Sequence, residues 1–82
     1  MSNGGVPREA RSPLIFAAAA ANAWLRGLSI PRVALHYRYE PLTALLLIWR
    51  FRRDYGAVHV GRFVPAGVLK KAGELFGRQD EV

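Results

Sequence analysis

Side chains that commonly carry out catalysis or bind metals are few in this chain of 82 residues. It has no Cys, and its two histidines, His36 and His59, have no partner at the spacing of a metal-binding motif. Metal sites need three or four convergent ligands, and the sequence offers no such cluster. The glycines form neither a dinucleotide-binding fingerprint nor a phosphate-binding loop. We therefore expect a protein that is not an enzyme and that binds no cofactor, metal or small-molecule substrate.

The functional groups that the sequence does provide in number are basic side chains. Twelve Lys and Arg residues stand against six Asp and Glu, which gives a formal net charge of +6. Most of the twelve are Arg, whose planar guanidinium stays charged and binds phosphate or carboxylate in a forked geometry. A pI near 10.8 with this bias towards Arg indicates a polyanionic partner. The candidate phosphate-binding residues are Arg26, Arg32, Arg50, Arg52, Arg53, Arg62, Lys70 and Lys71.

The densest basic cluster, residues 50–53, is interleaved with the aromatic residues Trp49, Phe51 and Tyr55. No zinc finger, RNP signature or other base-reading motif is present, so we expect contacts to phosphates that do not depend on base sequence. The aromatic rings would stack on bases if the nucleic acid were single-stranded. Anionic lipid headgroups are an alternative, and the choice among DNA, RNA and lipid stays open at this point.

The pattern along the chain predicts an all-α fold in a single domain, residues 1–82. Residues 1–12 are expected to form a flexible or docked arm, with Ser12 as helix cap and Pro13 as the first helical residue. An Ala-rich helix follows and stops at Gly27. A second, long apolar helix either begins at Pro41 or is kinked there, and Gly56 ends it. These two helices are expected to form a hairpin.

The C-terminal third of the chain is harder to interpret from its sequence. Residues 57–64 are rich in β-branched side chains and form either a short strand or, as we favour, a helix or irregular segment. Pro65 opens a short amphipathic helix that Gly77 ends, and residues 78–82 form a polar tail. Two ion pairs at helical spacing are expected, Arg50–Asp54 and Lys70–Glu74.

The apolar content is large for a chain of this length, since 51% of the residues are hydrophobic. A domain of this size buries only roughly 60% of the surface of its unfolded chain. We therefore expect apolar surface to be covered by other copies of the chain or by a membrane. Ala18 and Ala21, on one stripe of the first helix, would let another helix approach closely. The residues predicted to pack between subunits are Leu14, Ala18, Ala21, Trp24, Leu25, Leu45, Leu46, Ile48 and Trp49.

The Ala-rich helix, the turn at residues 27–31, and the second apolar segment with its arginines together resemble the coat proteins of rod-shaped or filamentous viruses of hyperthermophilic archaea. That resemblance implies a structural protein of the virion, a helical assembly of many identical copies, and double-stranded DNA held by basic residues on the inner face. The possible strand at residues 57–64 departs from the simple hairpin of that family. Two alternatives stay open: a small accessory subunit of a membrane protein complex, and a basic component of a ribosome or other ribonucleoprotein.

Overall fold

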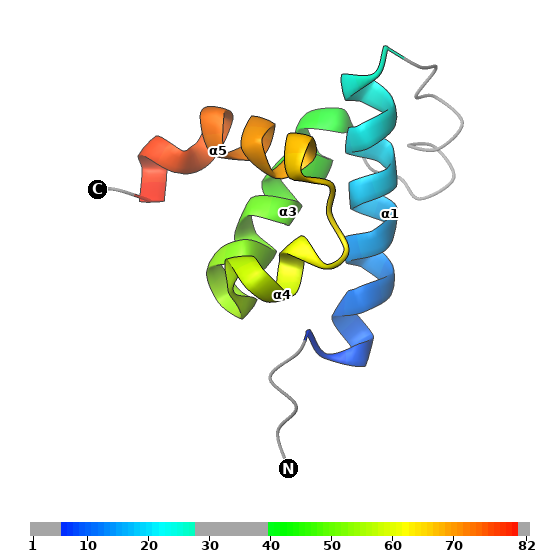
Figure 1. Ribbon diagram of the computed structural model, residues 1–82, viewed down its shortest axis with the longest axis vertical. Coiled ribbons are helices and arrows are strands. Elements are labelled where there is room, and N and C mark those ends of the chain that lie inside the picture. Colours follow the sequence, from blue (N-terminus) through cyan, green and yellow to red (C-terminus); the bar gives the residue numbers. More distant parts are fainter. Residues whose placement is uncertain (1–5, 28–39, 81–82) are drawn as a thin grey trace.

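The computed structural model describes residues 6–27 and 40–80, and these residues form helices without any strand. The helices are α1 (Arg8–Leu25), α3 (Pro41–Tyr55), α4 (Ala57–Gly61) and α5 (Ala66–Asp80). α1 and α3 pack side by side and run in roughly opposite directions, while α4 and α5 both pack on α3 (Figure 1). The predicted all-α fold is confirmed. Arg32 and His36 lie outside the described residues.

Helix α1 begins earlier than its sequence suggests. Its first residue is Arg8 and its N-cap is Pro7, so the predicted start at Ser12 and Pro13 is wrong. The amides of Ala10 and Arg11 donate to the carbonyl of Pro7 at 3.0 and 3.1 Å, which closes the first turn. Pro13 therefore lies inside the helix, where it removes one backbone hydrogen bond. Val6, which is only 5% exposed, anchors the segment before the helix to the core.

Two glycines end the long helices as predicted. Gly27 has φ +71° just beyond α1, and Gly56 has φ +96° at the end of α3. A residue with a Cβ is strained in that left-handed region, and glycine is not. At the other end of α3, Glu40 is extended and Pro41 is the first helical residue. The helix therefore begins at Pro41 rather than being kinked there.

The C-terminal third is more helical than the sequence indicates. Residues 57–61 form α4, so the alternative of a strand at 57–64 is not realised. The amide of Val68 donates to the carbonyl of Pro65 at 3.0 Å at the start of α5. This helix passes through Gly77 and continues to Asp80, so the predicted stop at Gly77 is wrong. Gly77 instead provides space for a neighbouring side chain, because a Cβ built there would lie 3.5 Å from the Trp49 ring.

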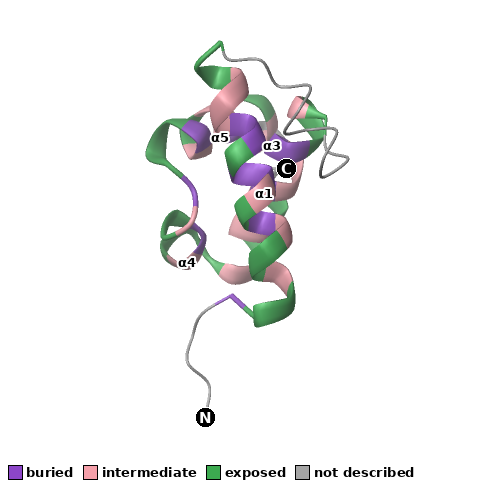
Figure 2. Cartoon of the chain, turned by 90° about the vertical axis from the view of Figure 1, so that its right-hand side faces the viewer, coloured by how far each residue is buried: buried purple, intermediate pink, exposed green. Residues whose placement is uncertain are grey.

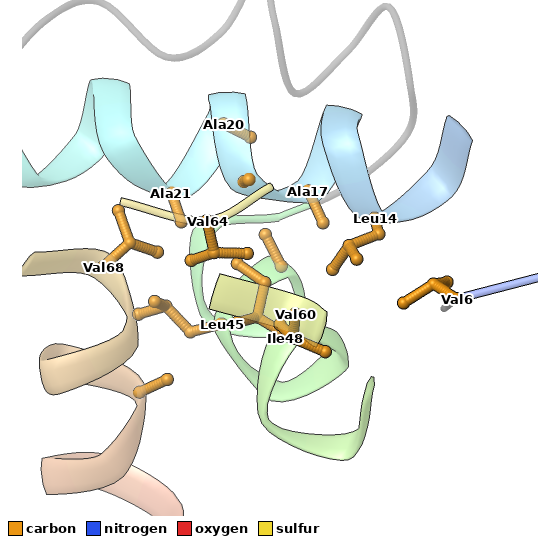
Figure 3. Packing of buried hydrophobic residues seen from close by; sticks show 13 residues of the cluster. Val6, Leu14, Ala17, Ala20, Ala21, Leu45, Ile48, Val60, Val64 and Val68 are labelled. Atoms are coloured by element: carbon orange, nitrogen blue, oxygen red, sulfur yellow. The ribbon is translucent and has the colours of Figure 1, made fainter. Parts of the chain in front are cut away.

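The core lies where α1, α3, α4 and α5 meet (Figure 2). Alanines on the inner face of α1 allow α3 to approach closely, and valines from α4, the following turn and α5 fill the remaining space (Figure 3). Among the described residues no polar or charged residue is classed as buried, so hydrophobic burial holds these helices together. The core residues are Val6, Leu14, Ala17, Ala18, Ala20, Ala21, Ala44, Leu45, Ile48, Val60, Val64, Val68 and Ala72.

Part of the predicted subunit interface is therefore internal. Leu14, Ala18, Ala21, Leu45 and Ile48 are at most 3% exposed within one copy of the chain. A second copy cannot contact these side chains while the helices stay packed, so the prediction is corrected for these five. The alanine stripe does bring a helix close, but that helix is α3 of the same chain. Of the others, Trp24, Leu46 and Trp49 are half-buried, and Leu25 is 37% exposed.

Candidate polyanion-binding surface

The antiparallel arrangement of α1 and α3 gathers arginines at one end of the molecule. The first turns of α1 lie at the same end as the last turn of α3 and the short helix α4 (Figure 1). Arg8 and Arg11 are in the first turns of α1, and Arg62 is the C-cap of α4. We call this group the basic end; it consists of Arg8, Arg11, Arg50, Arg52, Arg53 and Arg62. All are exposed except Arg52, which is half-buried.

The structure separates the remaining predicted basic residues from this group. Arg26 caps the opposite end of α1. Lys70 and Lys71 are in α5, which packs on α3 and lies above α4 in the view of Figure 1. Arg32 is outside the described residues. Four of the predicted residues, Arg50, Arg52, Arg53 and Arg62, thus lie at the same end of the molecule, with Arg50 and Arg52 on different faces of α3.

Arg8 and Arg11 were not among the predicted site residues, because the sequence analysis assigned them to an arm before the helix. One signal in the sequence does point to them. Residues 8–12 contain no Gly or Pro, and only Pro13 separates them from the Ala-rich segment. A helix that started at Arg8 would place both side chains at a fixed position on its first turns. The free N–H groups and dipole of a helix N-terminus add partial positive charge at the same place.

The last two turns of α3 hold an arginine over a tryptophan. The Cζ atom of Arg52 lies 4.4 Å from the centroid of the Trp49 ring, which is a cation–π contact. On the same stretch of helix, the rings of Phe51 and Tyr55 are stacked with centroids 5.6 Å apart. All three rings are half-buried and pack against the core. They are therefore occupied within the chain, and the predicted stacking on single-stranded bases would require these contacts to be broken.

The ion pairs differ from those predicted. Asp54 lies 3.6 Å from Nε of Arg53 rather than pairing with Arg50. Glu74 lies 3.9 Å from Nζ of Lys71 rather than pairing with Lys70. Both pairs are at the surface, where an ion pair contributes little to stability. In the described part of the chain no carboxylate forms an ion pair with Arg50 or Arg52.

The other end of α3 is apolar. A groove of about 340 Å³ lies between the first turns of α3 and the C-terminal half of α5. It is lined by Leu42, Thr43, Leu46, Leu75 and Phe76, none of which carries a charge. Leu42 is 56% exposed and Leu75 is 41% exposed at this groove. The first turns of α3 therefore keep apolar surface uncovered within one copy of the chain.

In residues 6–27 and 40–80, no group of three or more His, Cys, Asp or Glu residues is arranged to hold a metal ion. No helix in that part of the chain is long and apolar enough to cross a membrane. Comparison with known proteins gave no matching family model, no matching curated protein and no matching solved structure, so a functional assignment rests on the geometry alone.

Proposed function

We propose that this chain is a structural protein that coats double-stranded DNA. The basic end binds phosphates without regard to base sequence, and the apolar groove provides contacts between copies. The observation that carries this proposal is the separation of the two surfaces along α3. Its first turns line an uncharged groove, and its last turns carry Arg50, Arg52 and Arg53. A subunit of this kind can face a polyanion with one end and a neighbour with the other, as in the coat of a virion.

The chemistry of the basic end favours a duplex over a single strand. Duplex DNA carries one negative charge per about 1.7 Å of its axis, so several arginines on one small surface can each meet a phosphate. Recognition of single strands depends on bases stacking on accessible rings. Trp49, Phe51 and Tyr55 are instead packed within the chain. The preference for duplex over single-stranded nucleic acid should therefore depend on the charge density of the ligand rather than on base stacking.

The groove supports contact between two copies of the chain. Leu42 lines the groove and is 56% exposed, so one patch combines a hollow with an accessible apolar side chain. In a two-fold symmetric contact the same patch serves both partners, which requires this kind of self-complementarity. The lack of charge in the groove means that two copies can approach without burying an unpaired ion.

The test compares arginines at the basic end with basic residues elsewhere. The double variant Arg11→Gln, Arg50→Gln removes two charges from the basic end, and Arg26→Gln, Lys70→Gln removes two charges outside it. All four side chains are exposed, so neither variant disturbs the core. Affinity for a duplex of arbitrary sequence is measured by fluorescence anisotropy at about 0.1 M salt. Each lost phosphate contact should cost up to about eight-fold, so the first variant should lose at least about ten-fold in affinity and the second less than about three-fold.

Equal losses in the two variants would contradict the assignment of the basic end. The same titrations with RNA and with vesicles that contain anionic phospholipid address the alternatives. Tighter binding to RNA than to duplex DNA would point to a ribonucleoprotein component. Tighter binding to the vesicles would point to a membrane-associated role, for which the apolar groove would be the lipid-facing surface.

A further inference from the structure

An aromatic contact holds the side chain of Arg52 in place. Its guanidinium lies over the ring of Trp49, 4.4 Å from the ring centroid. The ring itself is held against α5 at Gly73 and Gly77. A Cβ built on Gly73 would lie 3.3 Å from Cη2 and Cζ3 of Trp49, and one on Gly77 would lie 3.5 Å from Cζ2. The indole therefore packs closely on Gly73, where an added Cβ would be tight, and lies at ordinary contact distance from Gly77.

Arg52 is only half-buried, so part of its side chain stays accessible beside this contact. An arginine stacked on an aromatic ring still presents N–H donors in the plane of its fork, where they match two oxygens of a phosphate. No carboxylate in the described part of the chain pairs with Arg52. A donor group that is held in place before binding loses less side-chain entropy when the phosphate arrives.

Building on the proposed function, we propose that Arg52 is the principal phosphate ligand of the basic end, with Trp49 as its positioning residue. The ligand is a phosphodiester oxyanion, bound by both arms of the guanidinium fork. Arg53 is the natural comparison because it is adjacent in sequence and carries the same charge. Its guanidinium already lies beside Asp54, at 3.6 Å, and its side chain is 60% exposed. An incoming phosphate would compete with that carboxylate.

The experiment replaces each arginine by lysine, which keeps the charge and removes the planar fork. Arg52→Lys should weaken duplex binding by about five-fold, the factor that corresponds to about 1 kcal/mol for one lost hydrogen bond of the fork to the phosphate. Arg53→Lys should change the affinity by less than about two-fold. Because neither variant alters the number of charges, the dependence of affinity on salt should stay unchanged in both. Circular dichroism spectra confirm that both variants are folded.

A second measurement reports on Trp49 directly. The chain has two tryptophans, so Trp24→Phe leaves Trp49 as the only indole. Binding of duplex should then change the Trp49 fluorescence, and the change should be much smaller when Arg52→Lys is added but not when Arg53→Lys is added. A structural role alone for Arg52 would alter stability without coupling Trp49 to the DNA. Vesicles that contain anionic phospholipid serve as a second source of phosphodiester, and a larger response to them than to duplex would identify a lipid headgroup as the ligand.

The possible failures are distinguishable. Equal losses for Arg52→Lys and Arg53→Lys, with normal binding by the unaltered chain, overturn the role of Arg52 and leave the proposed function standing. Trp49 fluorescence that does not respond to bound duplex overturns the positioning role of Trp49. An unaltered chain that binds no duplex overturns both this inference and the proposed function.

Discussion

Replacing Ala21 by leucine tests whether the alanine face of α1 belongs to the core or to an interface between copies. The Ala21 side chain is 0% exposed and packs in the cluster that includes residues of α3 and α5. Three additional carbon atoms cannot be placed there without moving α3, and overpacking of this kind costs about 1–3 kcal/mol. A chain of 82 residues has a total stability of roughly 4–12 kcal/mol. Ala21→Leu should therefore remove a substantial share of the total stability.

Ala19→Leu is the matched control, because Ala19 lies on the exposed face of the same helix. Alanine and leucine are both strong helix formers, so helix propensity does not distinguish the two variants. Urea denaturation followed by circular dichroism should show a free energy of unfolding lower by about 1–3 kcal/mol for Ala21→Leu, and a change within about 0.5 kcal/mol for Ala19→Leu. In thermal melts, Tm should fall by roughly 4–8 °C for each kcal/mol. If Ala21→Leu were as stable as Ala19→Leu but no longer self-associated, the alanine face would lie between copies and our description of the core would be wrong.

Leu45→Ala removes a side chain that is 0% exposed and should cost about 2–5 kcal/mol in the same urea titration; a cost below about 1 kcal/mol would argue against its burial. Gly77→Ala should raise the free energy of unfolding by up to about 1 kcal/mol, because alanine favours the helix and the added Cβ makes an ordinary contact. Gly73→Ala should raise the free energy of unfolding by less than Gly77→Ala does, or lower it, because its Cβ would lie 3.3 Å from the Trp49 ring. A greater gain in stability from Gly73→Ala than from Gly77→Ala would refute this packing of Trp49 on α5. Leu42→Glu should leave the stability of the monomer within about 0.5 kcal/mol and weaken self-association, which sedimentation velocity measures; unchanged association would exclude the groove as the contact between copies.

Three helix ends could be predicted from the positions of glycine and proline. Gly27 and Gly56 adopt positive φ and end their helices, and Pro41 begins α3. Gly77 and Pro13 misled the analysis because each type has a second use. Gly77 lies beside the Trp49 ring in mid-helix, and Pro13 is accommodated after the first turn of α1. Local sequence does not show which of these uses tertiary packing will select.

The candidate site could be predicted in part. The arginines at residues 50–53 are adjacent in the chain, so their proximity needs no tertiary information. Arg8 and Arg11 join them because α1 and α3 pack in opposite directions, as the predicted hairpin implies, and because α1 begins at Arg8 rather than at Pro13. The expected surplus of apolar surface was overestimated for a related reason. Much of that content is alanine, and the small side chains of α1 allow close packing of helices within one chain.

The dependence of duplex binding on salt concentration tests the central claim most directly. If the six arginines of the basic end meet phosphates, the logarithm of the association constant should fall linearly with the logarithm of salt concentration. The slope should be about −3 to −5, allowing for the arginine already paired with Asp54, and it should be the same for duplexes of different base sequence. A slope near zero, or binding to one sequence only, would contradict the account of a basic end that binds phosphates.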